Sequence, residues 1–190
     1  EVADLDDRGL ENVTKNSYKM AEGVGRSGRE LIDAATEFKR AGRDVETSLS
    51  LGSAALVTTN IGDNIKNVTE ASSALIAVLQ GFDIDDSKVM NVVDKINEVS
   101  NTQPIGFDNL TDGIQRISGT MKQAGNSLDE TMGMLTGGYS QLRNMSKVAT
   151  GLNTISATLR GMDEDGNAVD GLTAKLQSAF EKIGVDIVDT

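Results

Sequence analysis

The placement of glycine constrains the fold of this chain more than any other sequence feature. The sequence contains 20 glycines and one proline, and six of the glycines each follow a stretch whose apolar residues repeat at helical spacing. These six residues are Gly42, Gly62, Gly81, Gly106, Gly125 and Gly161. A glycine directly after a helix supplies the left-handed residue that ends the helix. The pattern predicts short amphipathic helices joined by glycine-containing turns.

Apolar stripes are clearest in the second half of the chain, over residues 85–100, 107–123, 127–142 and 145–160. The stripes consist of Val89, Val92, Val93, Ile96 and Val99; of Phe107, Leu110, Ile114, Ile117 and Met121; of Leu128, Met132, Leu135, Tyr139 and Leu142; and of Val148, Leu152, Ile155 and Leu159. Apolar residues three and four positions apart share one face of a helix. Each segment therefore predicts a helix, and the last stripe predicts a helix-packing seam.

Weaker stripes predict three helices in the first half, and a further stripe predicts a last helix at residues 171–183. They consist of Leu31, Ile32, Ala35 and Phe38; of Val45, Leu49, Leu56 and Val57; of Ile65, Val68, Leu75, Ile76 and Leu79; and of Leu172, Leu176, Phe180 and Ile183. No stretch alternates apolar and polar residues for long enough to predict a strand. The expected fold is all-α, with helical hairpins or a bundle and no β-sheet.

Helix starts are marked by residues that cap helices. Ser127 and Glu130 have the spacing of a capping box. Asp85 and Asp86 come before the stripe of 85–100, where carboxylates satisfy free N–H groups and the helix dipole. Asp, Asn and Ser residues directly after Gly62 and Gly125 are further candidate caps.

Composition excludes several kinds of function. The net charge is −11, and no segment is basic enough to bind nucleic acid through its phosphates. The chain has no Cys, which removes disulfides, thiolate catalysis and Cys-based metal sites, and without Cys or His the common nucleophile–base arrangements are absent as well. It contains no apolar run of membrane-spanning length. The first residue is Glu and no signal-like stretch follows, so we expect a fragment of a longer protein.

Three regions are expected along the chain. Residues 1–27 form a polar lead-in, either helical or frayed. Residues 28–161 form a helical domain, and residues 162–190 form an acidic loop followed by the predicted C-terminal helix.

One glycine cluster matches a nucleotide-binding motif letter for letter. Gly23, Gly25 and Gly28 give the pattern G-x-G-x-x-G. That motif binds a dinucleotide only between a buried strand and a helix. The preceding residues 16–22 are polar and unlike a buried strand, so a joint between helices is the favoured interpretation.

Other candidate sites have simpler explanations. The acidic run from Asp163 to Asn167, with Asp170, resembles the start of a calcium loop, but Ala168 and Ala174 occupy the positions of its required Gly and Glu. A solvated acidic turn is favoured.

Four N-x-[ST] sequons have no significance without a secretory signal. They begin at Asn12, Asn67, Asn109 and Asn144.

Two carboxylate pairs, Asp85 with Asp86 and Asp129 with Glu130, are better explained as helix caps than as acid–base couples. The sequence therefore predicts no catalytic, cofactor-binding or metal-binding residue and no enzyme.

A group of methionines between residues 121 and 162 is explained by core filling more readily than by an adaptable binding surface. These are Met121, Met132, Met134, Met145 and Met162.

Three motifs resemble the core region of the phage tail tape measure family. They read Val89 to Asn101, then Asp112 to Ser118 with Lys122 to Glu130, and then Val148 to Gly161. Residues 70–75 and 79–82 also resemble the family pattern, so the resemblance covers 65–161 well and 28–64 loosely. Two loops depart from it. They are Thr102-Gln103-Pro104-Ile105 and Gly137-Gly138-Tyr139-Ser140-Gln141.

The resemblance implies a mainly helical structural protein inside a growing tail tube. Its length would set tail length, and it would leave the lumen before DNA passes. The implied partners are further copies of itself, tail tube, tail tip or baseplate proteins and tail assembly chaperones, without direct nucleic-acid binding. The implied locations are the lumen or tip of the virion tail and, during assembly, the host cytoplasm.

Two other classes of function stay open on the sequence. A soluble helical adaptor or secreted effector would share the glycine-punctuated helices, and the genes beside the coding sequence would separate it from a tail protein. Some tape measure proteins carry cell-wall-degrading domains, but no residue pattern here supports an enzyme of that kind.

Overall fold

The computed structural model describes residues 15, 18–62, 65–161 and 182. These residues form helices and turns, and no strand occurs among them, so the expected all-α fold is confirmed. Residues 18–22 are helical. The helices that follow are α2 (Gly28–Arg40), α3 (Val45–Ile61), α4 (Val68–Gly81), the 3-10 turn η1 (Asp86–Lys88), α5 (Val89–Thr102), α6 (Phe107–Gln123), α7 (Leu128–Leu142) and α8 (Met145–Leu159).

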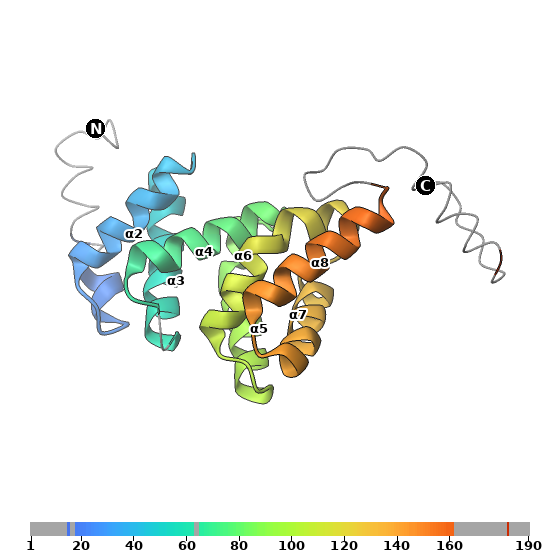
Figure 1. The fold of residues 1–190 in the computed structure, drawn as a ribbon. Coiled ribbons are helices and arrows are strands. Elements are labelled where there is room, and N and C mark those ends of the chain that lie inside the picture. Colours follow the sequence, from blue (N-terminus) through green and yellow to red (C-terminus); the bar gives the residue numbers. More distant parts are fainter. Residues whose placement is uncertain (1–14, 16–17, 63–64, 162–181, 183–190) are drawn as a thin grey trace.

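Helix α6 lies at the centre of the second half of the molecule and packs on α4, α5, α7 and α8. In the first half, α2 packs on α3 and α4. Helix α4 joins the two halves, running from the α2–α3 pair to α6 (Figure 1). Consecutive helices pack on each other except α4 and α5, and the contact of α4 with α6 connects the two halves into one body.

The sequence of α6 explains its central position. Its residues Leu110, Ile114, Ile117 and Met121 are spaced by four, three and four positions, and each is 0% exposed. That spacing produces a single apolar stripe, which neighbouring helices cover. The buried cluster extends without interruption from Ala21 to Ala149. One hydrophobic core therefore includes side chains from both halves of the chain.

Several methionines belong to this core. Met121, Met132 and Met145 are buried, and Met134 packs against the cluster. The core-filling interpretation is confirmed for these four residues. Met162 lies outside the described residues.

Most predicted segments correspond closely to helices. Segment 107–123 has the bounds of α6, and segments 127–142 and 145–160 differ from α7 and α8 by one residue. Segment 85–100 begins too early, because residues 86–88 form a tighter 3-10 turn before α5. The helix predicted at 171–183 and the acidic loop before it fall almost wholly outside the described residues.

Some residues assigned to apolar stripes are exposed. Ile155 and Leu159 in α8 and Leu142 at the end of α7 are each 57% exposed, so the predicted seam packs only over its first half. Ile32 is 42% exposed. It directly follows the buried Leu31, and a step of one residue turns a side chain by about 100° around the helix axis.

The glycine joints divide into two groups. Gly42, Gly125 and Gly161 adopt left-handed conformations, as predicted. The prediction is wrong for Gly62 and Gly106, whose φ angles are −81° and −70°, and for Gly81, which lies inside α4. Gly106 is the N-cap of α6, a position that tolerates glycine.

Close contacts explain the other two exceptions. A Cβ at Gly62 would overlap the side chain of Ile65, and a Cβ at Gly81 would overlap Ser118 of α6. The left-handed residue after α4 is instead Asp83, with a φ of 55°. The N-cap of α4 is Asn67, which lies four residues after Asp63 and three after Asn64, the caps that the sequence suggested.

One type of joint occurs four times among the described residues. The residue after each left-handed position donates its N–H to the carbonyl five residues earlier, at 2.8–3.2 Å. The pairs are Arg26 with Ala21, Arg43 with Phe38, Ile84 with Leu79, and Asn126 with Met121. This bond defines the Schellman motif. The next residue caps the following helix in each case, and these caps are Ser27, Asp44, Asp85 and Ser127.

Candidate interaction surface

The first glycine cluster is one of these joints. It follows helical residues 18–22 rather than a strand. Gly25 has a φ of 70°, and Ser27 caps α2 in a capping box with Glu30. Arg26 bonds Asn60 at 2.8 Å and Glu30 at 2.8 Å. The interpretation as a joint between helices is therefore confirmed.

The two carboxylate pairs separate into different roles. Asp85 caps the 3-10 turn, and Glu130 completes the capping box with Ser127. Asp86 and Asp129 lie in first helical turns, as the sequence indicated, but each side chain bonds a residue of another part of the chain. Asp86 accepts two bonds of 3.0 Å from Arg43, and Asp129 forms a salt bridge of 2.6 Å with Lys95. Each acid therefore has its own partner.

Cap hydrogen bonds also change acidity. A side-chain hydrogen bond from Ser87, followed by one from its backbone, lowers the pKa of Asp85. The backbone N–H of Ser127, followed by its hydroxyl, lowers the pKa of Glu130. Both groups are held in the charged form, as a cap requires.

The other candidate sites are structural or lie beyond the described part. Asn67 and Asn144 are N-caps that accept from the backbone of Glu70 and Lys147. Asn109 is within α6. The calcium-like run, its Asp170 and the sequon at Asn12 are outside the described residues.

Across the described ranges, no three acidic side chains cluster as metal ligands would. None of the helices described is both long and apolar enough to span a membrane.

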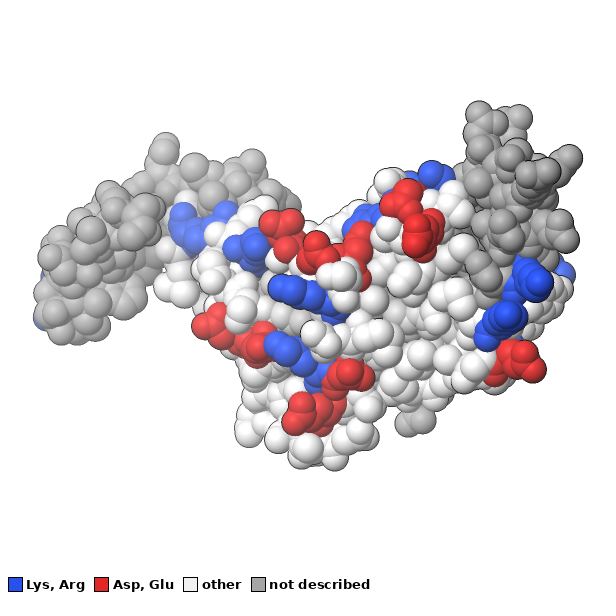
Figure 2. Space-filling model, turned by 180° about the vertical axis from the view of Figure 1, so that it is seen from behind, with Lys and Arg blue, Asp and Glu red and all other residues white. Residues whose placement is uncertain are grey.

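The surface carries mixed charge. Figure 2 shows acidic and basic side chains interleaved on the reverse face, with broad uncharged areas between them. A continuous basic surface of the kind that binds nucleic acid is not seen on this face.

A groove lies between α5 and α7. Both helices pack on α6, but they do not pack extensively on each other. The space between them contains two adjoining hollows of about 500 and 660 Å³. We call the two hollows together the α5–α7 groove. They meet at Lys95 and Asp129, whose salt bridge crosses the groove.

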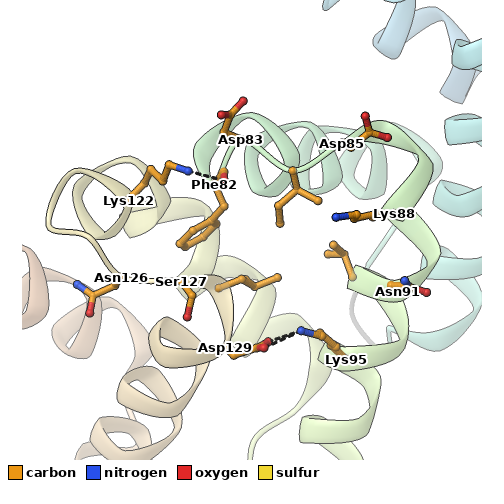
Figure 3. Close-up of a pocket in the computed structure, with 13 residues that line it drawn as sticks. Phe82, Asp83, Asp85, Lys88, Asn91, Lys95, Lys122, Asn126, Ser127 and Asp129 are labelled. Atoms are coloured by element: carbon orange, nitrogen blue, oxygen red, sulfur yellow. Dashed lines mark hydrogen bonds and ion pairs between the residues drawn. The ribbon is translucent and has the colours of Figure 1, made fainter.

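The first hollow lies at the joints that follow α4 and α6. Its floor contains Phe82, Ile84, Val92 and Leu128. Its polar side chains are Asp83, Asp85, Lys88, Asn91, Lys95, Lys122, Asn126, Ser127 and Asp129. Figure 3 shows the Lys88 ammonium pointing into this hollow and the carboxylates of Asp83 and Asp85 pointing away from it.

The second hollow continues between the two helices. It is lined by Lys95, Glu98, Val99, Gln103, Asp129, Met132, Gly133, Thr136, Gly137 and Ser140. The second hollow therefore contains apolar side chains and two glycines beyond the Lys95–Asp129 salt bridge.

Sequence reasoning did not find this groove. Two signals were present: Lys88 and Lys95 are seven residues apart, which places them near one helical face, and Gly133 and Gly137 are four apart. Neither signal indicates that α5 and α7 stand apart, because that depends on how each packs on α6.

The chain has recognisable relatives. A family model described as "Phage-related minor tail protein" matches residues 15–190. The "Probable tape measure protein" of Escherichia phage P2 is 22% identical over 179 residues, which cover 94% of this chain and 20% of the relative. The chain thus spans about a fifth of the length of that relative. No solved structure matches the chain.

Proposed function

The chain belongs to the phage-related minor tail protein family, and from this premise we propose that it is a helical part of a tape measure protein. In this role it acts in tail assembly and tail-length determination through helix-mediated contacts with other proteins. By family resemblance it also takes part in DNA ejection.

One observation carries this proposal: similarity to a probable tape measure protein extends over 94% of the chain. The all-helical body with mixed surface charge supports it, because such a body offers helix faces and grooves to protein partners. Since the relative is about five times longer, the proposal concerns one part of a larger ruler.

The folded shape suggests which part this is. As a single helix, 190 residues would reach roughly 285 Å at 1.5 Å per residue. The joints between α2 and α8 fold the chain back on itself and make it much shorter. We therefore assign the measuring stretch to other parts of the full protein and a docking role to this body.

The proposed partners follow from this role. They are further copies of the chain, tail tube proteins, tail tip or baseplate proteins, and tail assembly chaperones. The proposed locations are the lumen or tip of the virion tail and, during assembly, the host cytoplasm.

A buried-charge variant in the phage gene tests the proposal. Leu75 in α4 is 1% exposed, so Leu75→Asp would bury a charge and unfold the body. We expect at least tenfold fewer complete tails by negative-stain electron microscopy. Ser73→Asp is the matched control, because it places the same residue on the exposed face of α4. Normal numbers of normal-length tails with Leu75→Asp would refute the proposal.

We further propose that the role is structural and not catalytic. The carboxylates best placed to act as a couple are committed to caps and ion pairs instead. A zymogram with bacterial cell wall should accordingly give no clearing by the purified chain, whereas a clear band at its mass would contradict this part of the proposal.

A further inference from the structure

The apolar stripe of α8 is covered over only half of its length. Val148 is 4% exposed and lies against Gly138 of α7, and Leu152 packs against the core. Ile155 and Leu159, in the turns that follow, are each 57% exposed. Single exposed apolar side chains are common on protein surfaces, but these two continue a stripe whose first half is buried. We call the surface around Ile155 and Leu159 the α8 face.

The α8 face has room for a neighbouring helix. Gly151 lies one turn before Ile155, and a Cβ at this position would meet no atom of the described chain within 4 Å. Thr154 and Thr158, on either side of Ile155 in the sequence, are short. The charged side chain within α8 is Lys147, in its first turn. The α8 face therefore presents an uncharged apolar surface to a neighbour.

The end of α8 favours a return of the chain along the same helix. Gly161 follows α8 with a φ of 71°. Two other left-handed glycines, Gly42 and Gly125, each precede a helix that packs on the one before it, α3 on α2 and α7 on α6. By the same geometry, the first candidate to cover the α8 face is the next helical segment of this chain.

The next apolar stripe in the sequence is the one predicted at residues 171–183. It consists of Leu172, Leu176, Phe180 and Ile183, spaced by four, four and three positions. Lys182, which the structure describes, is helical and exposed. It lies about 100° around a helix from Ile183 and therefore outside the stripe. The segment thus has an apolar side that matches the α8 face in kind and in length.

The connection between the two stripes, residues 162–170, is polar and long enough for a hairpin. It contains Asp163, Glu164, Asp165 and Asp170 and no basic residue, so it is a poor cover for an apolar surface. Its extended reach is roughly 30 Å. Packed helix axes lie only about 8–10 Å apart, so the connection allows the next helix to return along α8.

We propose that residues 171–183 form a helix that packs antiparallel on the α8 face, with Leu172 beside Leu159 and Leu176 beside Ile155. The acidic connection is then the turn of a helical hairpin, and this end of the body is closed by its own chain. The family match extends through residue 190 and so includes this segment. The inference does not rest on the proposed function, because every residue in it belongs to this chain.

Disulfide cross-linking tests the register, and the chain suits this method because it contains no cysteine. Under a mild oxidant, Ile155→Cys with Leu176→Cys should form an intramolecular disulfide at least tenfold faster than Ile155→Cys with Ser178→Cys. Ser178 is the matched control, since a step of two residues places it on the opposite side of the predicted helix. Mass spectrometry without reductant measures both rates, and equal rates would overturn the proposal.

Labelling of a single cysteine tests whether the α8 face is covered. In the full chain, Ile155→Cys should react with a maleimide at least tenfold more slowly than Thr150→Cys, an exposed position on another side of α8. Leu176→Asp with Phe180→Asp should remove this protection, because a carboxylate is costly to bury against apolar groups. Gln177→Asp with Ser178→Asp adds the same charge off the stripe and should leave the protection intact. Equally fast labelling of Ile155→Cys and Thr150→Cys would refute the proposal.

The cross-linked product also separates the alternative occupant. A disulfide between Ile155→Cys and Leu176→Cys that joins two chains, in place of one within a chain, would assign the α8 face to a second copy, and the proposal would be wrong. The Leu75→Asp experiment tests the proposed function independently, so the failure of one proposal is distinguishable from the failure of the other.

Discussion

At the scale of single residues, the joints between helices depend on a few backbone positions. Gly25, Gly42 and Gly125 each adopt a positive φ, and Asp83 occupies the equivalent position after α4 with a φ of 55°. A side chain is strained in this region, although Asp tolerates it better than most residues. The four joints have the same hydrogen bonds but not the same strain.

Asp83→Gly should therefore stabilise the protein. Removing the strain should raise the free energy of unfolding by about 1 kcal/mol. Urea denaturation followed by circular dichroism would measure it. Asp83→Ala is the control, because it removes the carboxylate but keeps a Cβ. An equal rise with both variants would attribute the effect to charge instead.

Ser127→Ala should destabilise the protein by about 1 kcal/mol, because it removes the hydroxyl that accepts from the backbone N–H of Glu130 and donates to the Glu130 carboxylate. Ser140→Ala makes a suitable comparison. That hydroxyl bonds the Gly137 carbonyl within the same helix and lies on the surface, so its loss should cost only a few tenths of a kcal/mol. If both variants lose a similar free energy of unfolding in urea denaturation, the cap contributes no more than an ordinary surface hydroxyl.

At the scale of elements, glycines control how closely helices approach. Gly81 of α4 lies against Ser118 of α6, and Gly113 of α6 lies against Met145 and Leu135. Both sites bring a neighbouring side chain into the space where a Cβ would be. These contacts join α4 to α6 and α6 to the α7–α8 pair.

Gly81→Ala should lower the free energy of unfolding by about 1–3 kcal/mol, because the added methyl group would overlap Ser118. Gly119→Ala, one residue from Ser118, should raise it by up to about 1 kcal/mol, because its Cβ would meet open space. Thermal unfolding of both variants measures the difference. Shifts in the same direction would show that helix propensity outweighs contact at Gly81.

The positions of most helices were predictable from the sequence. Which helix faces are buried, and how far apart the helices lie, were not. Local periodicity defined α6 to the residue because its stripe is buried along its whole length. The same periodicity predicted a packing seam in α8, but Ile155 and Leu159 are exposed. Periodicity reports which residues share a face and contains no information on what covers that face. The groove depends on the separation of α5 and α7, which is a property of three helices together.

At the scale of the whole molecule, one continuous core connects helices from both halves of the chain. The surface holds several carboxylates whose pKa values are lowered by caps. The main causes are backbone hydrogen bonds from Ser27 to Glu30, from Thr47 to Asp44 and from Ser127 to Glu130. These caps link the stability of the whole body to pH.

Acid should weaken the fold through these groups. A pKa lowered in the folded state contributes stability that is complete above the ordinary value of 4.5 for Glu or 3.8 for Asp. This stability is lost as pH falls through the lowered values. Urea denaturation at pH 7 and pH 3 should give a smaller free energy of unfolding at pH 3.

The variant Ser27→Ala with Ser127→Ala isolates the contribution of the caps. It removes hydroxyl bonds that lower the pKa values of Glu30 and Glu130, so its stability should change less between the two pH values. A difference as large as in the parent chain would contradict this origin. Comparing variants also cancels the general relief of negative charge in acid.

The repeated Schellman joints have a consequence for how the chain reaches this structure. Each joint is closed by a hydrogen bond spanning five residues, and several helix pairs in contact, such as α2 with α3 and α7 with α8, are consecutive in sequence. Contacts between close neighbours in sequence favour rapid folding, since little loop-closure entropy must be lost before they form. This local connectivity favours rapid refolding of the unfolded chain.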